Sequence, residues 1–185
     1  MTFSARSKTF STTVVSIIAT LILGIAFAPT LVTAAWHLTH KKQIHAGGRT
    51  FLVPARWYPS IDYRTVTLAK FYPILRPEKP VSAVITLSPF LALPQTDAKR
   101  QSGCQSFASF FLAHMTSDAG ATRGPIRAGT ENLEACCMET AFKNKHNGIS
   151  ADCLAIGGSW TANFQGPPEE LATFYKVITE LPSTK

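Results

Sequence analysis

Four cysteines are the most reactive residues of this 185-residue sequence: Cys104, Cys136, Cys137 and Cys153. An even number of cysteines in an exported chain favours disulfide bonds over free thiols. Adjacent cysteines rarely bridge each other, because the small ring strains the peptide bond between them towards cis. Adjacent residues of a strand also point to opposite faces of a sheet. We therefore expect Cys136 and Cys137 to bond to different partners, Cys104 and Cys153, and both ways of pairing them stay open.

The same cysteines carry an alternative function, that of a thiol-redox or metal-handling protein in which Cys136 or Cys137 is a reactive thiol. The sequence has no Cys-x-x-Cys spacing, which thioredoxin-type and haem-attachment sites need. It also lacks phosphate-loop, dinucleotide and nucleophile-elbow motifs. His37 and His40 are three residues apart, and we interpret them as a solvated cap. We predict no cofactor, metal or catalytic residue, and favour binding over enzyme activity.

Three large aromatic residues, Trp57, Tyr58 and Tyr63, lie close together beside a turn that contains proline. If these rings are exposed, they form a candidate binding patch on the surface. The alternative is that they close one end of a sheet as part of the core, which is the commoner arrangement for such clusters.

The first 36 residues form the segment predicted to reach a membrane. No charged side chain occurs in residues 11–36, and about 20 apolar residues are enough to span a bilayer. Arg6 and Lys8 precede the segment, which favours a cytoplasmic N-terminus, although Lys41 and Lys42 add positive charge beyond it. We favour an uncleaved transmembrane helix. The alternatives are a signal peptide cleaved near Ala34, which would release a secreted or periplasmic domain, and a buried helix of a cytosolic protein.

The remaining chain is divided into a linker and one domain. Residues 37–48 are polar, end in two glycines and predict a linker. Residues 49–182 are long enough for one hydrophobic core and are predicted to fold outside the cytoplasm. The sequence has 18 basic and 11 acidic residues, and the basic ones are scattered along it. Nucleic-acid binding needs such residues to cluster, so the pattern excludes that function.

Short apolar runs, partial alternation at 63–71 and β-branched residues at 81–87 predict strands at residues 50–53, 63–71, 81–87, 133–138, 149–156 and 160–164. Glycine and proline predict a turn at residues 56–59, loops at 88–103 and 120–129, and tight turns at 143–148 and 157–158.

Two helices are predicted from apolar residues that recur at helical spacing. The face of the first, which ends near Ser117, comprises Phe107, Phe110, Phe111 and His114. The face of the second, which Pro182 ends, comprises Leu171, Phe174, Tyr175 and Ile178. The predicted fold class is α+β: an N-terminal transmembrane helix followed by one antiparallel sheet with packed helices.

The domain starts with TFLVPARWYP at residues 50–59 and closes with WTANFQGPPEELATFYKVITELP at residues 160–182. The first segment resembles the opening strand and Pro-x-x-Trp turn of PsbP-like α/β/α sandwich domains, and the second is similar to their final strand and helix. Together the segments cover about a fifth of the chain. The resemblance implies a small sandwich fold of the kind used by exported accessory proteins, and it carries no catalytic residues.

These patterns favour a membrane-tethered accessory or binding domain that works outside the cytoplasm without catalysis. Its predicted partners are the membrane, through residues 11–36, and a protein of the cell envelope. The sequence does not indicate which ligand such a domain binds.

Overall fold

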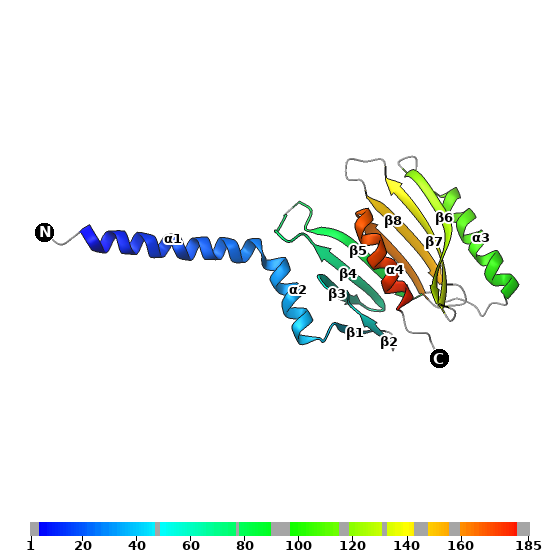
Figure 1. Ribbon diagram of the computed structural model, residues 1–185, viewed down its shortest axis with the longest axis horizontal. Helices are drawn as coiled ribbons and strands as arrows, with labels where there is room; N and C mark the ends of the chain where they lie inside the picture. Colours follow the sequence, from blue (N-terminus) through cyan, green and yellow to red (C-terminus); the bar gives the residue numbers. More distant parts are fainter. Residues whose placement is uncertain are drawn as a thin grey trace.

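The computed structural model describes residues 4–46, 49–76, 78–89, 97–114, 119–130, 133–142, 148–155 and 160–180. Within these residues, seven strands form one antiparallel sheet in the order β3-β4-β5-β9-β8-β7-β6. Helix α4 lies across one face of this large sheet, α3 lies beside its β6–β7 end, and α1 projects away from the domain (Figure 1). The predicted α+β class with an antiparallel sheet is confirmed.

The helices are α1 (Ser4–Ala26), α2 (Ala28–Thr39), α3 (Asp97–Ala113) and α4 (Leu171–Thr179), with a 3-10 turn η1 at Pro168–Glu170. The large sheet contains β3 (Trp57–Asp62), β4 (Thr65–Phe71), β5 (Val81–Pro89), β6 (Ala119–Thr130), β7 (Leu133–Phe142), β8 (Ile149–Ala155) and β9 (Trp160–Gly166). A separate antiparallel pair consists of β1 (Gln43–Ala46) and β2 (Arg49–Leu52).

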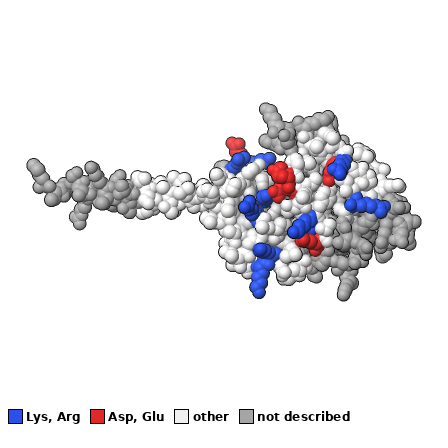
Figure 2. Space-filling model, in the orientation of Figure 1, with Lys and Arg blue, Asp and Glu red and all other residues white. Residues whose placement is uncertain are grey.

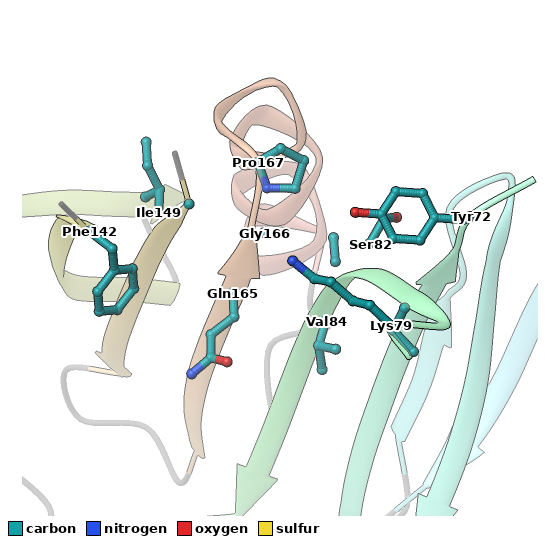
Figure 3. Close-up of a pocket in the computed structure, with 12 residues that line it drawn as sticks. Tyr72, Lys79, Ser82, Val84, Phe142, Ile149, Gln165, Gly166 and Pro167 are labelled. Atoms are coloured by element: carbon teal, nitrogen blue, oxygen red, sulfur yellow. The ribbon is translucent and has the colours of Figure 1, made fainter. Parts of the chain in front are cut away.

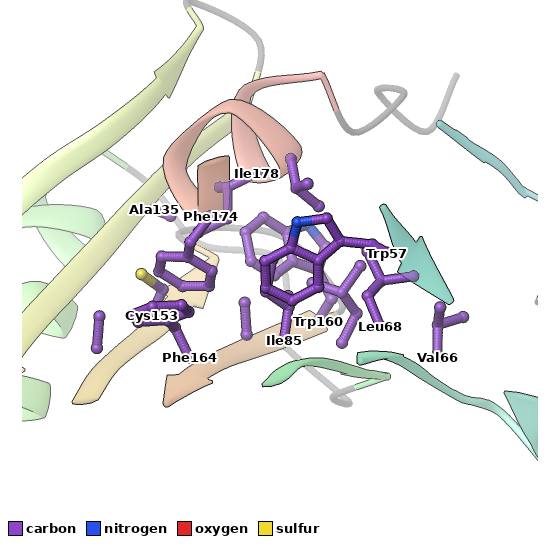
Figure 4. Close-up of a cluster of buried hydrophobic side chains, with 14 of the residues drawn as sticks. Trp57, Val66, Leu68, Ile85, Ala135, Cys153, Trp160, Phe164, Phe174 and Ile178 are labelled. Carbon is purple, nitrogen blue, oxygen red and sulfur yellow. The ribbon is translucent and has the colours of Figure 1, made fainter. Parts of the chain in front are cut away.

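The core lies between the large sheet and α4 (Figure 4). Burial alternates along β9, where Trp160, Ala162 and Phe164 are buried and the residues between them are less so. The ring of Phe164 stacks on that of Phe174 in α4, with centroids 5.4 Å apart. Phe174 and Ile178 are fully buried, which confirms the predicted apolar face of the last helix.

Residues 120–129, predicted to be a loop, belong to β6, an edge strand of the large sheet. The register of β6 against β7 shifts between Ala119 and Thr122 and again between Arg123 and Ile126. Pro125 lies in the second shift. A bulge in an edge strand tolerates a residue without an N–H, because no sheet hydrogen bond is lost. The residues that predicted a loop therefore mark bulges, and that prediction is wrong.

Helix α3 begins at Asp97, inside the predicted loop 88–103. Residues 97–101 lack apolar periodicity, yet their Ala, Lys, Arg and Gln residues have high helix propensity. The helix packs through Cys104 and Ala108, which are buried, whereas Phe110 of the predicted face is 63% exposed. The predicted end near Ser117, Pro182 and most of the predicted turns at 143–148 and 157–158 lie outside the described residues.

The turn predicted at residues 56–59 begins earlier than expected. The Trp57 N–H donates to the Pro54 carbonyl at 3.1 Å and closes a turn in which Arg56 has a φ of 68°. Strand β3 then starts at Trp57 and includes Pro59. Because β3 is the other edge of the large sheet, it too can hold a residue that donates no backbone hydrogen bond.

The N-terminal segment is bent between α1 and α2, whose axes meet at 66°. Within the described residues no single helix is long and apolar enough to cross a membrane, but this bent pair has the required length and composition. Pro29, in the first turn of α2, has no N–H to continue the hydrogen bonding of α1. The single straight helix that the sequence predicts is thus replaced by a broken one.

Most of the predicted linker at residues 37–48 is folded. Helix α2 continues to Thr39, and residues Gln43–Ala46 form β1. Ile44 of β1 and Val53 just after β2 are buried in the core. A buried residue in an otherwise polar segment gives little periodic signal, which explains why the sequence predicts a linker here.

Candidate functional site

Helix α2 is attached to the sheet domain along one face. Thr33 is 5% exposed, and Trp36 packs against the hydrophobic core. The Nε2–H of His37 donates to the carbonyl oxygen of Trp57 at 2.9 Å. A helix that buries a threonine and bonds to β3 is part of the domain.

The loop between β4 and β5 supports the junction of α1 and α2. The N–H of Leu75 donates to the carbonyl oxygen of Ala26, the last residue of α1, at 2.8 Å. The hydroxyl of Thr30 in α2 donates to the carbonyl oxygen of Pro73 at 3.0 Å. These two bonds hold the bend against the sheet domain.

A cavity of about 690 Å³, the α2 pocket, lies between α2 and the β3–β4 side of the sheet. Its apolar lining residues are Pro29, Ala34, Leu38, Ala55, Phe71 and Pro73. Its basic and titratable lining residues are His37, Lys42, Arg56 and Lys70. No carboxylate is among the residues that line it, so the α2 pocket combines apolar walls with an excess of positive charge.

One basic residue of the α2 pocket is paired with a carboxylate, and two others have an unfavourable backbone conformation. Lys70 forms an ion pair with Glu170 of η1. Lys42 and Arg56 have φ angles of 61° and 68°, in the left-handed region. Side chains with a Cβ are disfavoured there and glycine is preferred, at a cost of about 1–2 kcal/mol per residue. Two cations thus occupy positions where the backbone alone would favour glycine.

The Nδ1 atom of His37 is buried and has no hydrogen-bond partner among the described residues. Because a carbonyl oxygen only accepts, the bond to Trp57 places the proton of the neutral ring on Nε2. Nδ1 is then an acceptor without a donor. Unpaired buried polar atoms are rare in folded proteins, and this one belongs to a residue that lines the α2 pocket.

A second cavity of about 420 Å³ lies where β5 and β9 run side by side (Figure 3). Its polar lining residues are Tyr72, Lys79, Ser82 and Gln165, and its apolar ones include Val84, Phe142 and Ile149. One cation, Lys79, is among the residues that line it. The α2 pocket is larger and more strongly charged, and it is the stronger candidate site.

The four cysteines form two disulfides, Cys104–Cys136 and Cys137–Cys153, with Cα atoms 5.5 Å and 4.1 Å apart. The expectation that the adjacent cysteines take different partners is confirmed. The first bond ties α3 to β7, and the second joins paired residues of β7 and β8. Each cysteine is at most 4% exposed. A thiol-redox site needs a sulfur that reactants can reach, so their burial favours a structural role.

The structure does not gather the three aromatic residues into one surface. Trp57 is 1% exposed and belongs to the core, whereas Tyr63 is 90% exposed. Tyr63 lies beyond the other end of β3, in the hairpin turn before β4. That turn shortens the predicted strand 63–71, because β4 starts at Thr65. Tyr58 is half-buried near Trp36, with ring centroids 6.5 Å apart.

Two acidic side chains outside the pockets, the half-buried Asp152 and the buried Glu139, are involved in pKa shifts. Burial raises the pKa of Asp152, although hydrogen bonds from Asn163 at 2.6 Å and Ser150 at 3.3 Å favour its charged form. Burial and the hydrogen bond that its hydroxyl donates to Glu139 raise the pKa of Tyr175. Neither group lines a pocket described above, and we assign both to structural hydrogen bonding.

No group of three or more potential metal-ligating side chains occurs within the part of the chain that the structure describes. His40, three residues after His37, stacks on the ring of Trp36 with centroids 4.8 Å apart. The pocket residues Lys42, Arg56 and Lys70 do not follow from sequence patterns. They are far apart in the chain, and a left-handed lysine or arginine has no sequence signature.

The chain matches no model of a known protein family, and no curated protein sequence matches it. The resemblance to PsbP-like domains therefore stays a prediction.

Proposed function

We propose that this chain is a membrane-tethered domain that works outside the cytoplasm and binds a ligand in the α2 pocket without converting it. The observation that carries the proposal is the α2 pocket itself, where apolar walls and basic side chains meet at the base of an apolar helix. A pocket that combines these features suits an amphiphilic or anionic ligand.

Exposed apolar residues support the membrane tether. Along α1 they include Val15, Ile17, Leu21, Ile22 and Ile25, each at least 55% exposed. Figure 2 shows no charged side chain on the white, described part of α1, whereas charged side chains of both signs begin where it meets the domain. Such a continuous apolar surface on a helix indicates contact with lipid or another apolar surface.

The same apolar surface extends to the domain itself. Leu31 and Val32 of α2 are 58% and 52% exposed, on the side away from the sheet. In the β4–β5 loop, Ile74 is 54% exposed, and its neighbour Leu75 bonds to the end of α1. The domain therefore presents apolar side chains at the point where the helix would leave a bilayer.

The position of α2 favours an uncleaved anchor over a signal peptide. Cleavage before Ala35 would remove the buried Thr33 and three other residues that line the α2 pocket: Pro29, Thr30 and Ala34. It would also remove the Thr30 hydroxyl that bonds to Pro73. A mature chain that begins at Ala35 would lose one wall of its candidate site.

The disulfides support the proposed compartment, because disulfides persist mainly outside the cytoplasm. A protein partner in the cell envelope remains a prediction.

The test is to express the full chain in a bacterial host with a membrane and an oxidising envelope. We expect the intact mass of an uncleaved chain, retention in the membrane pellet after carbonate extraction, and no free thiols after denaturation. A soluble product beginning at Ala35 would contradict the tether. Reactive thiols at Cys136 or Cys137 would favour the thiol-redox alternative.

A further inference from the structure

We propose that the α2 pocket binds the headgroup of an anionic membrane lipid that carries a phosphate and a free hydroxyl, as phosphatidylglycerol does. This inference rests on the membrane tether proposed above. It assigns the ligand class, the source of the ligand and the groups that recognise it.

The bend between α1 and α2 sets the height of the pocket above the bilayer. Helix α2 has 12 residues, which at 1.5 Å per residue gives a length of about 18 Å. Because its axis is turned by 66° from that of α1, it rises only about 7 Å along the α1 axis. The headgroup layer on each side of a bilayer is about 5–8 Å thick. Because only the bent pair has the length and composition of a span, this placement requires that the apolar side chains of α1 lie in the hydrocarbon and that α2 lies along the interface. In that arrangement the α2 pocket lies at headgroup height.

The walls of the pocket match the two parts of a lipid. Leu38 and Phe71 provide apolar surface, while Lys42 and Arg56 provide cations with no carboxylate among the lining residues. Arg56 can contact a phosphate through two N–H groups, and Lys42 supplies a second charge. A phosphate in this position would also lie within the attraction of Lys70, although that residue is paired with Glu170.

The unpaired acceptor nitrogen of His37 favours a headgroup that carries a hydroxyl group. Its Nε2–H is occupied by the Trp57 carbonyl, so the buried Nδ1 of the neutral ring can only accept a hydrogen bond. A phosphate diester has no hydrogen to donate, whereas the glycerol of phosphatidylglycerol has hydroxyl groups. Nδ1 is covered in the ligand-free chain, so the hydroxyl would reach it when neighbouring side chains move aside, while the phosphate contacts the two cations.

The backbone geometry gives an independent indication. Lys42 and Arg56 hold left-handed conformations in which glycine would be more stable. Strained residues cluster at functional sites, because the surrounding fold holds them in place for another purpose. Lys42 and Arg56 line the same pocket, so we infer that the fold holds them in this conformation in order to bind a ligand.

The experiment is a lipid titration of the full chain in neutral detergent micelles, followed by native mass spectrometry. Three lipids are compared: phosphatidylglycerol, the anionic diester phosphatidylmethanol, which has no free hydroxyl, and the zwitterionic phosphatidylcholine. Inorganic phosphate in large excess is added as a competitor. The variants are the pair Lys42→Gln/Arg56→Gln, the single change His37→Gln, and Lys176→Gln as a control. Lys176 is an exposed cation of α4 and does not line the α2 pocket.

We expect the chain to retain phosphatidylglycerol in preference to phosphatidylcholine. Each cation near an anionic lipid contributes about 1 kcal/mol, so removing two should weaken binding about 30-fold. Lys176→Gln should leave binding unchanged. His37→Gln keeps an N–H for the Trp57 carbonyl and removes Nδ1. It should therefore reduce the preference for phosphatidylglycerol over phosphatidylmethanol, an anionic phosphate diester without a free hydroxyl.

Equal retention of phosphatidylglycerol and phosphatidylcholine would overturn the lipid proposal, as would an equal loss in the pocket variant and the Lys176 control. Displacement of the lipid by inorganic phosphate would show a site for free phosphate instead. If the double variant does not fold, the His37→Gln result decides. Carbonate extraction is scored separately: a chain that carbonate releases contradicts the tether, whereas a retained chain without lipid preference contradicts only the ligand.

Discussion

The two halves of the large sheet are stabilised in different ways. Both disulfides lie in the half formed by β6–β9 with α3 and α4. The half formed by β3–β5 with α2 contains no cysteine. Instead, the four non-glycine residues with positive φ in the described part of the chain all lie at or near it: Lys41, Lys42, Arg56 and Tyr63. The disulfide bonds are concentrated in one half of the sheet, and the strained backbone positions lie at the other half.

We infer from this difference that the disulfide-bonded half mainly determines the stability of the fold and that the half with α2 mainly determines binding. A rigid half can compensate for strained positions elsewhere, provided that both halves share one core. They do share it, because the same cluster contains Trp57 and Leu68 from one half and Phe164 and Phe174 from the other (Figure 4). We therefore expect substitutions in the disulfide-bonded half to change mainly stability, and substitutions around the α2 pocket to change mainly binding.

The largest effect is expected for Phe174→Ala. Phe174 is fully buried against Phe164, so its removal should lower the free energy of unfolding by about 3–5 kcal/mol. Denaturation of the full chain in detergent, followed by tryptophan fluorescence, measures this. Lys176→Ala on the exposed face of α4 is the control and should change stability by less than about 0.5 kcal/mol. A loss below about 1 kcal/mol for Phe174→Ala would show that α4 is not docked.

Removing one disulfide should have the next largest effect. The Cys137–Cys153 bond closes a loop of 16 residues, and its loss should cost about 3 kcal/mol in the chain-entropy model. The variant is Cys137→Ala/Cys153→Ala. Hydrogen exchange should then increase in β7 and β8 until these strands resemble β3 and β4. If exchange stays unchanged there, the disulfides do not cause the difference between the halves.

Arg56→Gly should act in the opposite direction. Glycine relieves the left-handed conformation at φ 68°, so the free energy of unfolding should rise by about 1 kcal/mol while lipid retention falls. Arg64 lies in the neighbouring hairpin turn without a positive φ, and Arg64→Gly should destabilise instead. Lower stability in Arg56→Gly would mean that the arginine side chain stabilises the fold and that the strain argument is wrong.

The smallest effect concerns Asp152 and pH. Burial raises the pKa of Asp152 above its usual 3.8, so the folded chain holds this proton more tightly than the unfolded chain. The contribution to stability is therefore fully present below pH 3.8 and is lost as the pH rises through the folded pKa. Asp152→Asn keeps polar atoms for Asn163 and Ser150 and should be more favourable at pH 7 than at pH 3, when both chains are compared by thermal unfolding. A difference independent of pH would show that Asp152 is not the group that titrates.

Sequence patterns predicted the disulfide-bonded half better than the strained half. Burial alternates along β9, turn residues separate the apolar runs of β7 and β8, and the apolar face of α4 recurs at helical spacing, so these elements were predictable. The cysteines were informative because adjacency restricts their pairing. Bulges in β6 were hidden, since glycine and proline have the same local signature in a loop and in an irregular edge strand.

The candidate site was beyond the reach of sequence patterns. Its residues come from α2, from the segments beside β1 and β3, and from β4, and their proximity is a property of the fold. The bend at Phe27 also determines whether the α2 pocket forms, because a straight helix would carry residues 28–39 away from the sheet. Pro29 accounts for the break between the helices, but a proline alone does not fix the direction of the bend.

The two edge strands of the large sheet each contain a proline, Pro59 in β3 and Pro125 in β6. Anchored proteins diffuse in two dimensions, where neighbours meet often and in similar orientations. Under these conditions an open sheet edge would be a template for polymerisation between copies. Proline cannot donate the hydrogen bond that an added strand would need, so it interrupts such growth at both edges. A chain tethered as proposed would therefore remain dispersed even at high density on a membrane surface.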